Sequence, residues 1–151
     1  MKPLALGSSL LAIVGSVVSL TLPATAINAA YFAKTTQILY LPTIGGAELR
    51  LTQIILPRGK WVINYSATAA NGGNNDIIRC YVRAKETGEI LSGHITSAGS
   101  QLSASSITTI SGVTLVNLSE PTTMFLTCSH DLNARTPYIQ YIDSGAEIVA
   151  Y

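Results

Sequence analysis

The two cysteines are the residues whose placement most directly implies chemistry. Cys80 lies in the stretch IIRCYVRA and Cys128 in the stretch TMFLTCS, where apolar and polar residues alternate. Alternate side chains of a strand share a face, so each cysteine points with its apolar neighbours toward the interior. Thiols that meet in an oxidising compartment normally join. We therefore predict a Cys80–Cys128 disulfide; the alternative is two separate buried thiols that pack as small hydrophobes.

Ser129, His130 and Asp131 include the three residue types of a hydrolase triad. Neighbours in an extended segment point to opposite faces, so these side chains cannot converge on one another. A triad would need partners from elsewhere, such as His94. We predict that the protein is not an enzyme and that residues 129–131 are an exposed turn after a strand ending at Cys128. A secreted hydrolase is the less favoured alternative.

Metal binding has little support in the sequence. His94 and His130 lack the spacing of a zinc site. The loop Asn71–Asp76 offers amide and carboxylate oxygens that could hold calcium together with Asp131 or Asp143. Calcium takes six to eight oxygens, usually from several carboxylates, whereas this loop has a single acid. We therefore predict no cofactor, keep calcium as the alternative, and interpret the loop as a hairpin turn.

The first 26 residues have the layout of a secretory signal peptide. Lys2, an uncharged apolar run, Pro23 and the triplet Ala24-Thr25-Ala26 follow in that order. An uncleaved membrane anchor is the alternative, since about 20 apolar residues span a bilayer. We predict cleavage, followed by secretion to the cell exterior, the cell surface or the periplasm, with no membrane contact afterwards.

The charge balance excludes several classes of partner. The nine basic residues fall to eight once Lys2 is removed, and these equal the eight acidic residues. A balanced chain has no electrostatic footprint for nucleic acid, anionic lipid or a strongly charged substrate. Charged residues make up only 11% of the chain, and a net charge near zero eases self-association. We therefore expect a homo-oligomer.

The pattern of the mature chain predicts an all-β fold. Period-two alternation recurs between turn residues, and no stretch has a sustained helical stripe. In KWVINYSATA the odd positions from Trp61 to Ala69 form the inward face, and the closing AEIVAY predicts a last core strand. The stretch AELRLTQIIL alternates and then slips at Gln53, which indicates a bulge.

These strands predict a two-sheet antiparallel sandwich over residues 47–151. Residues 27–46 precede it as an arm or an edge strand. Within the sandwich, residues 101–109 and 112–118 are predicted as separate strands on either side of a turn at Ser111–Gly112. The spacing of the turns suits a sandwich or a small barrel, and the length of the mature chain suits a single domain.

The positions of a tryptophan and a tyrosine separate two kinds of sandwich. An immunoglobulin fold places a tryptophan between its two cysteines and a tyrosine two residues before the second. Here Trp61 precedes both cysteines, and Leu126 occupies the tyrosine position. A jelly roll is therefore favoured over an immunoglobulin-like sandwich.

Two stretches resemble the C1q and tumour-necrosis-factor group of compact jelly rolls. LPRGKWVINYSA is similar to the Gly-x-aromatic strand of that group, with Gly59 at the turn, and DSGAEIVAY is similar to its final core strand. Small secreted bacterial proteins with a Leu-Pro-x-Gly-x-aromatic strand and two cysteines are similar as well. The resemblance covers residues 47–151 in outline. Members of that group commonly form trimers and bind ligands without catalysis, so the resemblance implies a binding or structural module. It carries over no ligand-binding residue.

Aromatic side chains on outer strand faces are the remaining candidates for function. Tyr81, Phe125, Tyr138 and Tyr141 are predicted to form a surface that stacks on sugars or contacts another subunit. We therefore expect a secreted, noncatalytic β-sandwich that acts as a structural or binding module and self-associates, with a glycan or a protein as its ligand. A carbohydrate-binding, lectin-like module is the alternative.

Overall fold

The computed structural model describes residues 30–85, 88–99, 106–132, 138–139 and 145–151; the predicted signal peptide lies outside these ranges. Within them the chain forms strands joined by turns and loops. The strands are β1 (Tyr31–Thr35), β2 (Leu39–Tyr40), β3 (Leu49–Leu56), β4 (Gly59–Asn71), β5 (Asp76–Ala84), β6 (Ile90–Ala98), β7 (Ser106–Leu118), β8 (Thr122–His130), β9 (Tyr138–Ile139) and β10 (Ala146–Ala150).

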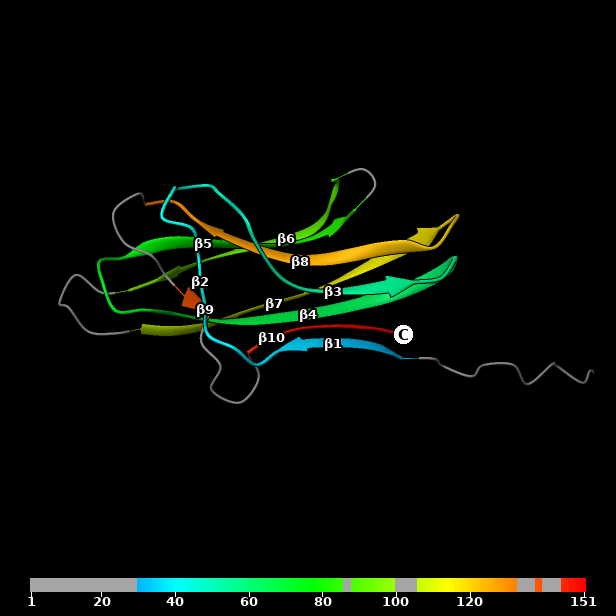
Figure 1. The fold of residues 1–151 in the computed structure, drawn as a ribbon, viewed down its shortest axis with the longest axis horizontal. Helices are drawn as coiled ribbons and strands as arrows, with labels where there is room; N and C mark the ends of the chain where they lie inside the picture. The colour runs from blue at the N-terminus through cyan, green and yellow to red at the C-terminus, as the bar shows by residue number, and fades with distance from the viewer. Residues whose placement is uncertain (1–29, 86–87, 100–105, 133–137, 140–144) are drawn as a thin grey trace, which may run out of the picture.

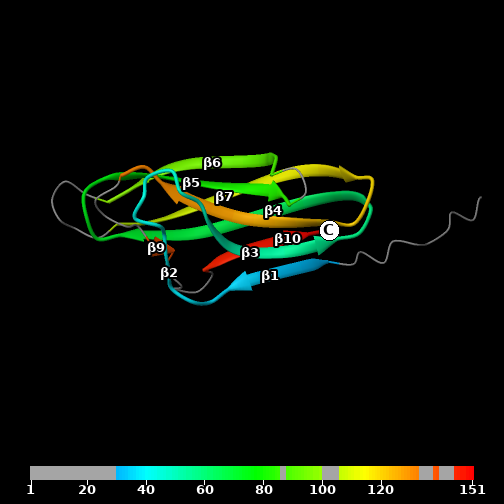
Figure 2. The same cartoon turned by 45° about the horizontal axis from the view of Figure 1, so that its top comes forward.

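The strands form two antiparallel sheets stacked as two layers (Figure 1). The six-stranded sheet has the order β1-β10-β4-β9-β2, with β7 on the other side of β4. The four-stranded sheet has the order β3-β8-β5-β6. The short strands β2 and β9 lie together at one end of the sandwich (Figure 2), where β9 pairs with the last part of β4. The prediction of an all-β, two-sheet antiparallel sandwich is confirmed.

Alternating apolar side chains from both sheets fill the space between the layers. On β4 the odd positions from Ile63 to Ala69 are buried, as predicted, and Trp61 is half-buried at the start of that face. Each fully buried large side chain contributes about 1.5–3 kcal/mol by leaving water. The fully buried large apolar side chains include Leu56, Ile63, Ile78, Val82, Met124, Leu126 and Ile148.

Strand β3 contains the predicted bulge. Its pairing with β8 shifts between Arg50 and Thr52, which makes Leu51 the inserted residue. Leu51 and Ile54 are three positions apart, so in a regular strand they would face opposite sides, yet both are buried. The insertion thus changes which positions face inward. In the apolar run that follows Gln53, Ile54 and Leu56 are therefore buried and Ile55 is exposed on the other face.

The prediction of two strands divided by a turn at Ser111–Gly112 is wrong. Strand β7 is continuous from Ser106 to Leu118 and pairs with β4 along its whole length. Gly112 lies opposite Tyr65 in this register, and a Cβ at Gly112 would collide with the Tyr65 hydroxyl and the His94 ring. The glycine therefore permits a close approach of side chains and does not mark a turn. Residues 101–105, also predicted as part of a strand, lie outside the described residues.

Cys80 and Cys128 form the predicted disulfide. The two residues are direct partners in the neighbouring strands β5 and β8, their Cα atoms are 4.1 Å apart, and both side chains are buried. The bond thus joins adjacent strands of one sheet and faces the other sheet. The disulfide of an antibody domain instead connects its two sheets.

The last strand lies inside the six-stranded sheet. β10 pairs with β1 on one side and with β4 on the other, and Ile148 is fully buried. The backbone of Tyr151 continues the pairing by exchanging two hydrogen bonds with Val62. β1 consequently forms the edge of the sheet and depends on β10 for its pairing.

Deleting residues 148–151 should prevent the protein from folding. The deletion removes the buried Ile148 and Ala150 and takes hydrogen-bond partners from two strands at once. We expect loss of the soluble, folded protein, measured by soluble yield and cooperative thermal unfolding. The matched control, Tyr151→Ala, keeps the backbone and should fold. A soluble truncated protein with a cooperative transition would contradict the central position of β10.

Replacing both cysteines with alanine should lower stability by about 4 kcal/mol, because the bond closes a loop with a sequence separation of 48 residues. The free energy of unfolding in urea is the measurement. The reduced wild-type protein is the control and should unfold at a similar urea concentration to the double variant. Equal stability of the oxidised and reduced proteins would contradict a stabilising role for the bond.

Candidate binding surfaces

His130 is a buried residue, contrary to the predicted exposed turn. β8 continues to His130, whose Nδ1 lies 2.8 Å from Asp76 Oδ2 and whose Nε2 donates to the Pro42 carbonyl oxygen at 2.5 Å. Asp76 Oδ1 also accepts the backbone N–H groups of Asp131 and Leu132, at 3.2 and 3.1 Å. The pair therefore ties together the start of β5, the end of β8 and the loop before β3, and these contacts keep residue 130 inside the fold.

Ser129, His130 and Asp131 do not form a triad. Both ring nitrogens of His130 face hydrogen-bond acceptors, so neither is available to take a proton from a serine. Ser129 is buried on the opposite face of β8, and Asp131 forms an ion pair with Arg79. In a triad the serine hydrogen-bonds to the histidine and the histidine to the aspartate, whereas each of these three side chains is directed elsewhere.

A second polar cluster joins the two sheets where β6 lies beside β7. The Tyr65 hydroxyl is 2.5 Å from His94 Nδ1 and 3.2 Å from Ser92 Oγ. Thr114 donates to the Leu91 carbonyl oxygen at 3.2 Å further along the border between β6 and β7, which we call the seam. Burial raises the pKa of the Tyr65 phenol, and the hydrogen bond with Ser92 opposes that rise only in part. The cluster thus closes one side of the sandwich with hydrogen bonds between the two sheets.

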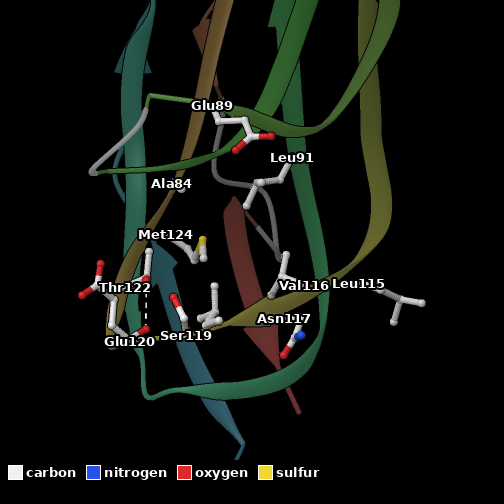
Figure 3. A pocket seen from close by; sticks show the side chains of 11 residues that line it. Ala84, Glu89, Leu91, Leu115, Val116, Asn117, Ser119, Glu120, Thr122 and Met124 are labelled. Carbon is white, nitrogen blue, oxygen red and sulfur yellow. Dashed lines mark hydrogen bonds between the residues drawn. The ribbon is translucent and has the colours of Figure 1, made fainter.

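The seam opens into a hollow beyond Leu91, because β6 begins at Ile90 whereas β7 extends to Leu118 (Figure 3). The hollow has a volume of about 410 Å³, within the range of small-molecule pockets. Met124 and Leu91 point into it, and Leu115 points away. Its lining, among the described residues, contains the hydroxyl groups of Ser119 and Thr122 and the carboxylates of Glu89 and Glu120, but no histidine, lysine or cysteine.

The loop Asn71–Asp76 is not a hairpin turn, because the strands it connects belong to different sheets. The Asn71 side chain donates to the carbonyl oxygens of Asn74 and Ala98, at 2.8 and 3.0 Å, and accepts a backbone N–H within the loop. The Asp76 carboxylate is bound to His130. These internal hydrogen bonds shape the crossover and occupy the side-chain oxygens of Asn71 and Asp76, two of the residues that the sequence offered for calcium.

The outer face of the six-stranded sheet carries a cluster of apolar side chains that the sequence analysis missed. The register places them in two neighbouring rows across β1, β10, β4 and β7. Leu115 is 77% exposed, and Phe32 and Val113 are each 59% exposed. Asn64 lies within the cluster and donates to the Tyr151 hydroxyl. We call this cluster the apolar patch; it consists of Phe32, Val62, Val113, Leu115, Val149 and Tyr151.

The outer face of the four-stranded sheet is different in chemistry. The Arg50 guanidinium lies 3.9 Å from the centre of the Phe125 ring, and the Arg83 guanidinium lies 5.3 Å from the centre of the Tyr81 ring. Arg83 also binds the Glu48 carboxylate through Nε, at 2.7 Å, and through Nη2. We call this surface the arginine–aromatic face; it consists of Arg50, Arg79, Tyr81, Arg83 and Phe125.

The structure brings together two of the four aromatic residues that the sequence singled out. Tyr81 and Phe125 both belong to the arginine–aromatic face, where Tyr81 is half-buried and Phe125 is almost fully covered. Tyr138 belongs to β9 in the other sheet, and its side chain lies outside the described residues. Tyr141 also lies outside them. Tyr81 is therefore the accessible aromatic ring of this surface.

No family model matches the chain, and no curated protein sequence matches it. Within the described ranges, no three histidine, cysteine or acidic side chains come together in a way that could hold a metal ion. The same part of the chain contains no helix that is long and apolar enough to cross a membrane.

The Glu48–Arg83 pair gives a test of the arginine–aromatic face. Burial alone would raise the pKa of the Glu48 carboxyl, but hydrogen bonds from Arg83 and Thr127 and the charge of Arg83 hold the pKa below its ordinary value of 4.5. Because the folded pKa is the lower one, the stabilisation is complete above about pH 4.5 and is lost as the pH falls through the folded value.

Glu48→Gln should therefore lower stability at pH 7 by about 1 kcal/mol, as for a partly exposed ion pair, and by less at pH 3. Urea unfolding of both proteins at the two pH values is the measurement. Glu120→Gln, which removes an exposed carboxylate in the turn before β8, is the control and should leave stability at pH 7 nearly unchanged. A cost of the Glu48 substitution that is the same at both pH values would contradict the assignment.

Proposed function

We propose that this protein is a secreted, noncatalytic β-sandwich that works as a structural or binding module and self-associates through the apolar patch. The observation that carries the proposal is the gathering of six apolar side chains on one outer sheet face, with Leu115 77% exposed. Isolated exposed apolar residues are ordinary on a monomer, whereas a contiguous group marks a contact surface.

A second copy of the same chain is the partner that this face fits best. With strands about 4.8 Å apart and about 3.4 Å between residues, the whole outer face of the four strands, which includes the polar residues around the patch, covers on the order of 600 Å². This area is near the roughly 800 Å² that each partner buries in a standard interface. Lys34 and Glu147 face each other across β1 and β10 beside the patch, so its border carries both signs of charge. The absence of a net charge on the mature chain removes the general repulsion between copies.

The strand order supports a jelly roll as the form of this sandwich. The strands pair as nested partners, β1 with β10, β3 with β8, β4 with β7 and β5 with β6. Eight strands paired in this way are typical of a double-sheet jelly roll. The position of the disulfide within one sheet also favours the jelly roll over an immunoglobulin-like arrangement. This is the architecture that the resemblance to the C1q and tumour-necrosis-factor group implies.

Two observations support export and the lack of catalysis. The Cys80–Cys128 disulfide is the kind of bond that persists in an oxidising compartment. The histidines His94 and His130 are held in hydrogen bonds that join structural elements, and neither faces the hollow between β6 and β7.

Leu115→Lys should convert the assembly into a monomer, because it places a charge at the most exposed side chain of the apolar patch. Sedimentation velocity at micromolar concentration should show an oligomer for the wild type and a monomer for the variant. Ile55→Lys is the matched control, since Ile55 is 62% exposed on the opposite sheet and should leave the assembly intact. A wild-type protein that remains strictly monomeric at these concentrations would refute self-association.

A further inference from the structure

Two stretches of the chain carry the acceptor pattern for N-linked glycosylation. They are Asn64-Tyr65-Ser66 and Asn117-Leu118-Ser119, in which a serine follows two residues after an asparagine with no proline between them. Enzymes of the secretory pathway attach an oligosaccharide to the side-chain nitrogen of such an asparagine. Because the glycan is bulky and hydrated, a folded protein carries it on an exposed side chain. The two stretches have the same pattern, and the fold distinguishes between them.

Asn64 is enclosed by the six-stranded sheet. It lies in the middle of β4, opposite Val149 of β10 on one side and Val113 of β7 on the other, and it is half-buried. Its Nδ2, the atom that a glycan would occupy, donates to the Tyr151 hydroxyl. A glycan at this position would break that hydrogen bond and lie in the middle of the sheet face. The fold therefore disfavours modification of Asn64.

Asn117 has the opposite surroundings. It is the last residue but one of β7 and lies beside the turn 119–121 that leads into β8. Asn117 and Ser119, the two residues that define the acceptor pattern, are both exposed. Within the six-stranded sheet β7 pairs with β4 on one side, and no described strand of that sheet pairs with its other side. A glycan on Asn117 can therefore extend into solvent without disturbing the core or the strand pairing.

Asn117 also borders the apolar patch. Leu115 and Asn117 project from the same outer face of β7 and are separated by about 7 Å along the strand. Val62 and Lys60 lie opposite them in β4. A hollow of about 290 Å³ on this part of the sheet is lined by Lys60, Trp61, Val62, Leu115, Val116 and Asn117. The first sugars of a glycan on Asn117 thus lie within reach of Leu115, the most exposed side chain of the patch.

We infer that Asn117 is an N-glycosylation site and that its glycan keeps the apolar patch from joining two copies of the chain. The donor is a lipid-linked oligosaccharide diphosphate, and the catalyst is an oligosaccharyltransferase of the secretory membrane. The bond between the sugar C1 atom and phosphate breaks, a bond from C1 to Asn117 Nδ2 forms, and one proton of this nitrogen passes to the released lipid diphosphate. Modification rests on the proposed export, and its effect on assembly rests on the proposed self-association.

The glycan opposes assembly for two physical reasons. A second copy that covers Leu115 comes within one or two residues of Asn117, where the volume of the glycan excludes it. A copy that nevertheless approached would strip water from the sugar hydroxyl groups without replacing their hydrogen bonds, which is costly. The unmodified chain has neither obstacle, so the state of Asn117 decides whether the patch is available.

Secretion of the full chain from a glycosylating eukaryotic cell tests the modification. Mass spectrometry of a tryptic digest should show a glycan on the peptide that contains Asn117 and none on the peptide that contains Asn64. Asn117→Gln and Ser119→Ala should each abolish the glycan, although the second variant keeps the asparagine, and Ser119→Thr should retain it. Residues 27–151 secreted behind a signal peptide of the host cell are the control, because they separate a failure of export from a failure of modification.

Sedimentation velocity at micromolar concentration tests the effect on assembly. The glycosylated wild type should be a monomer, whereas Asn117→Gln and Ser119→Ala from the same cells should self-associate. These two variants change different residues and add no charge, so a shared result follows from the loss of the glycan. Thermal unfolding of each protein separates a change of assembly from a loss of the fold.

Four results would overturn parts of this inference. Folded protein secreted behind the host signal peptide without a glycan at Asn117 would refute the site, and so would equal modification of Asn64. A fully glycosylated protein that still self-associates would refute the effect on assembly. A monomeric, folded Asn117→Gln protein would refute the proposed self-association and with it the role of the glycan, while the site itself would stand on its mass spectrum.

Discussion

The register between β4 and β7 is the constraint on which the rest of the molecule depends. All thirteen residues of β4 have a partner in β7, from Gly59 opposite Leu118 to Asn71 opposite Ser106. This register brings Gly112 to Tyr65 and so lets the phenol reach across the seam to His94. A shift by one residue would turn every side chain of β7 to the other face of its sheet. The core, the seam and the outer surface of this sheet would then be lost together.

The two outer faces divide the surface of the sandwich into regions of unlike chemistry. The six-stranded sheet exposes aliphatic and aromatic side chains with few charges, and desolvating such a face is favourable. The four-stranded sheet exposes arginines, carboxylates and partly covered rings that are already bound to one another. Such a face is costly to dehydrate unless a partner replaces its hydrogen bonds. The two faces therefore suit different kinds of contact, and one can be occupied while the other remains open.

Short-range pattern predicted much of the fold, and long-range pairing explains what it missed. Cys80 and Cys128 each sit in an alternating stretch, so their inward direction and their disulfide followed from the sequence. Gly112 was misinterpreted because the rings that require a glycine there come from strands 47 and 18 residues away. His130 was misplaced for the same reason, since its partner Asp76 belongs to another strand. The apolar patch was missed because Phe32, Leu115 and Tyr151 come onto one sheet face only through the strand order.

The placement of β1 beside β10 also determines how the molecule responds to mechanical force. Tyr31 lies opposite Ala150, so pulling the start of β1 away from the end of β10 opens the hydrogen bonds between these strands one after another. Sequential opening needs far less force than breaking all of them at once. The disulfide would nevertheless limit the extension, because its loop of 48 residues would hold back about 160 Å of chain. A stretched molecule would yield readily at its edge and keep most of the four-stranded sheet from unravelling.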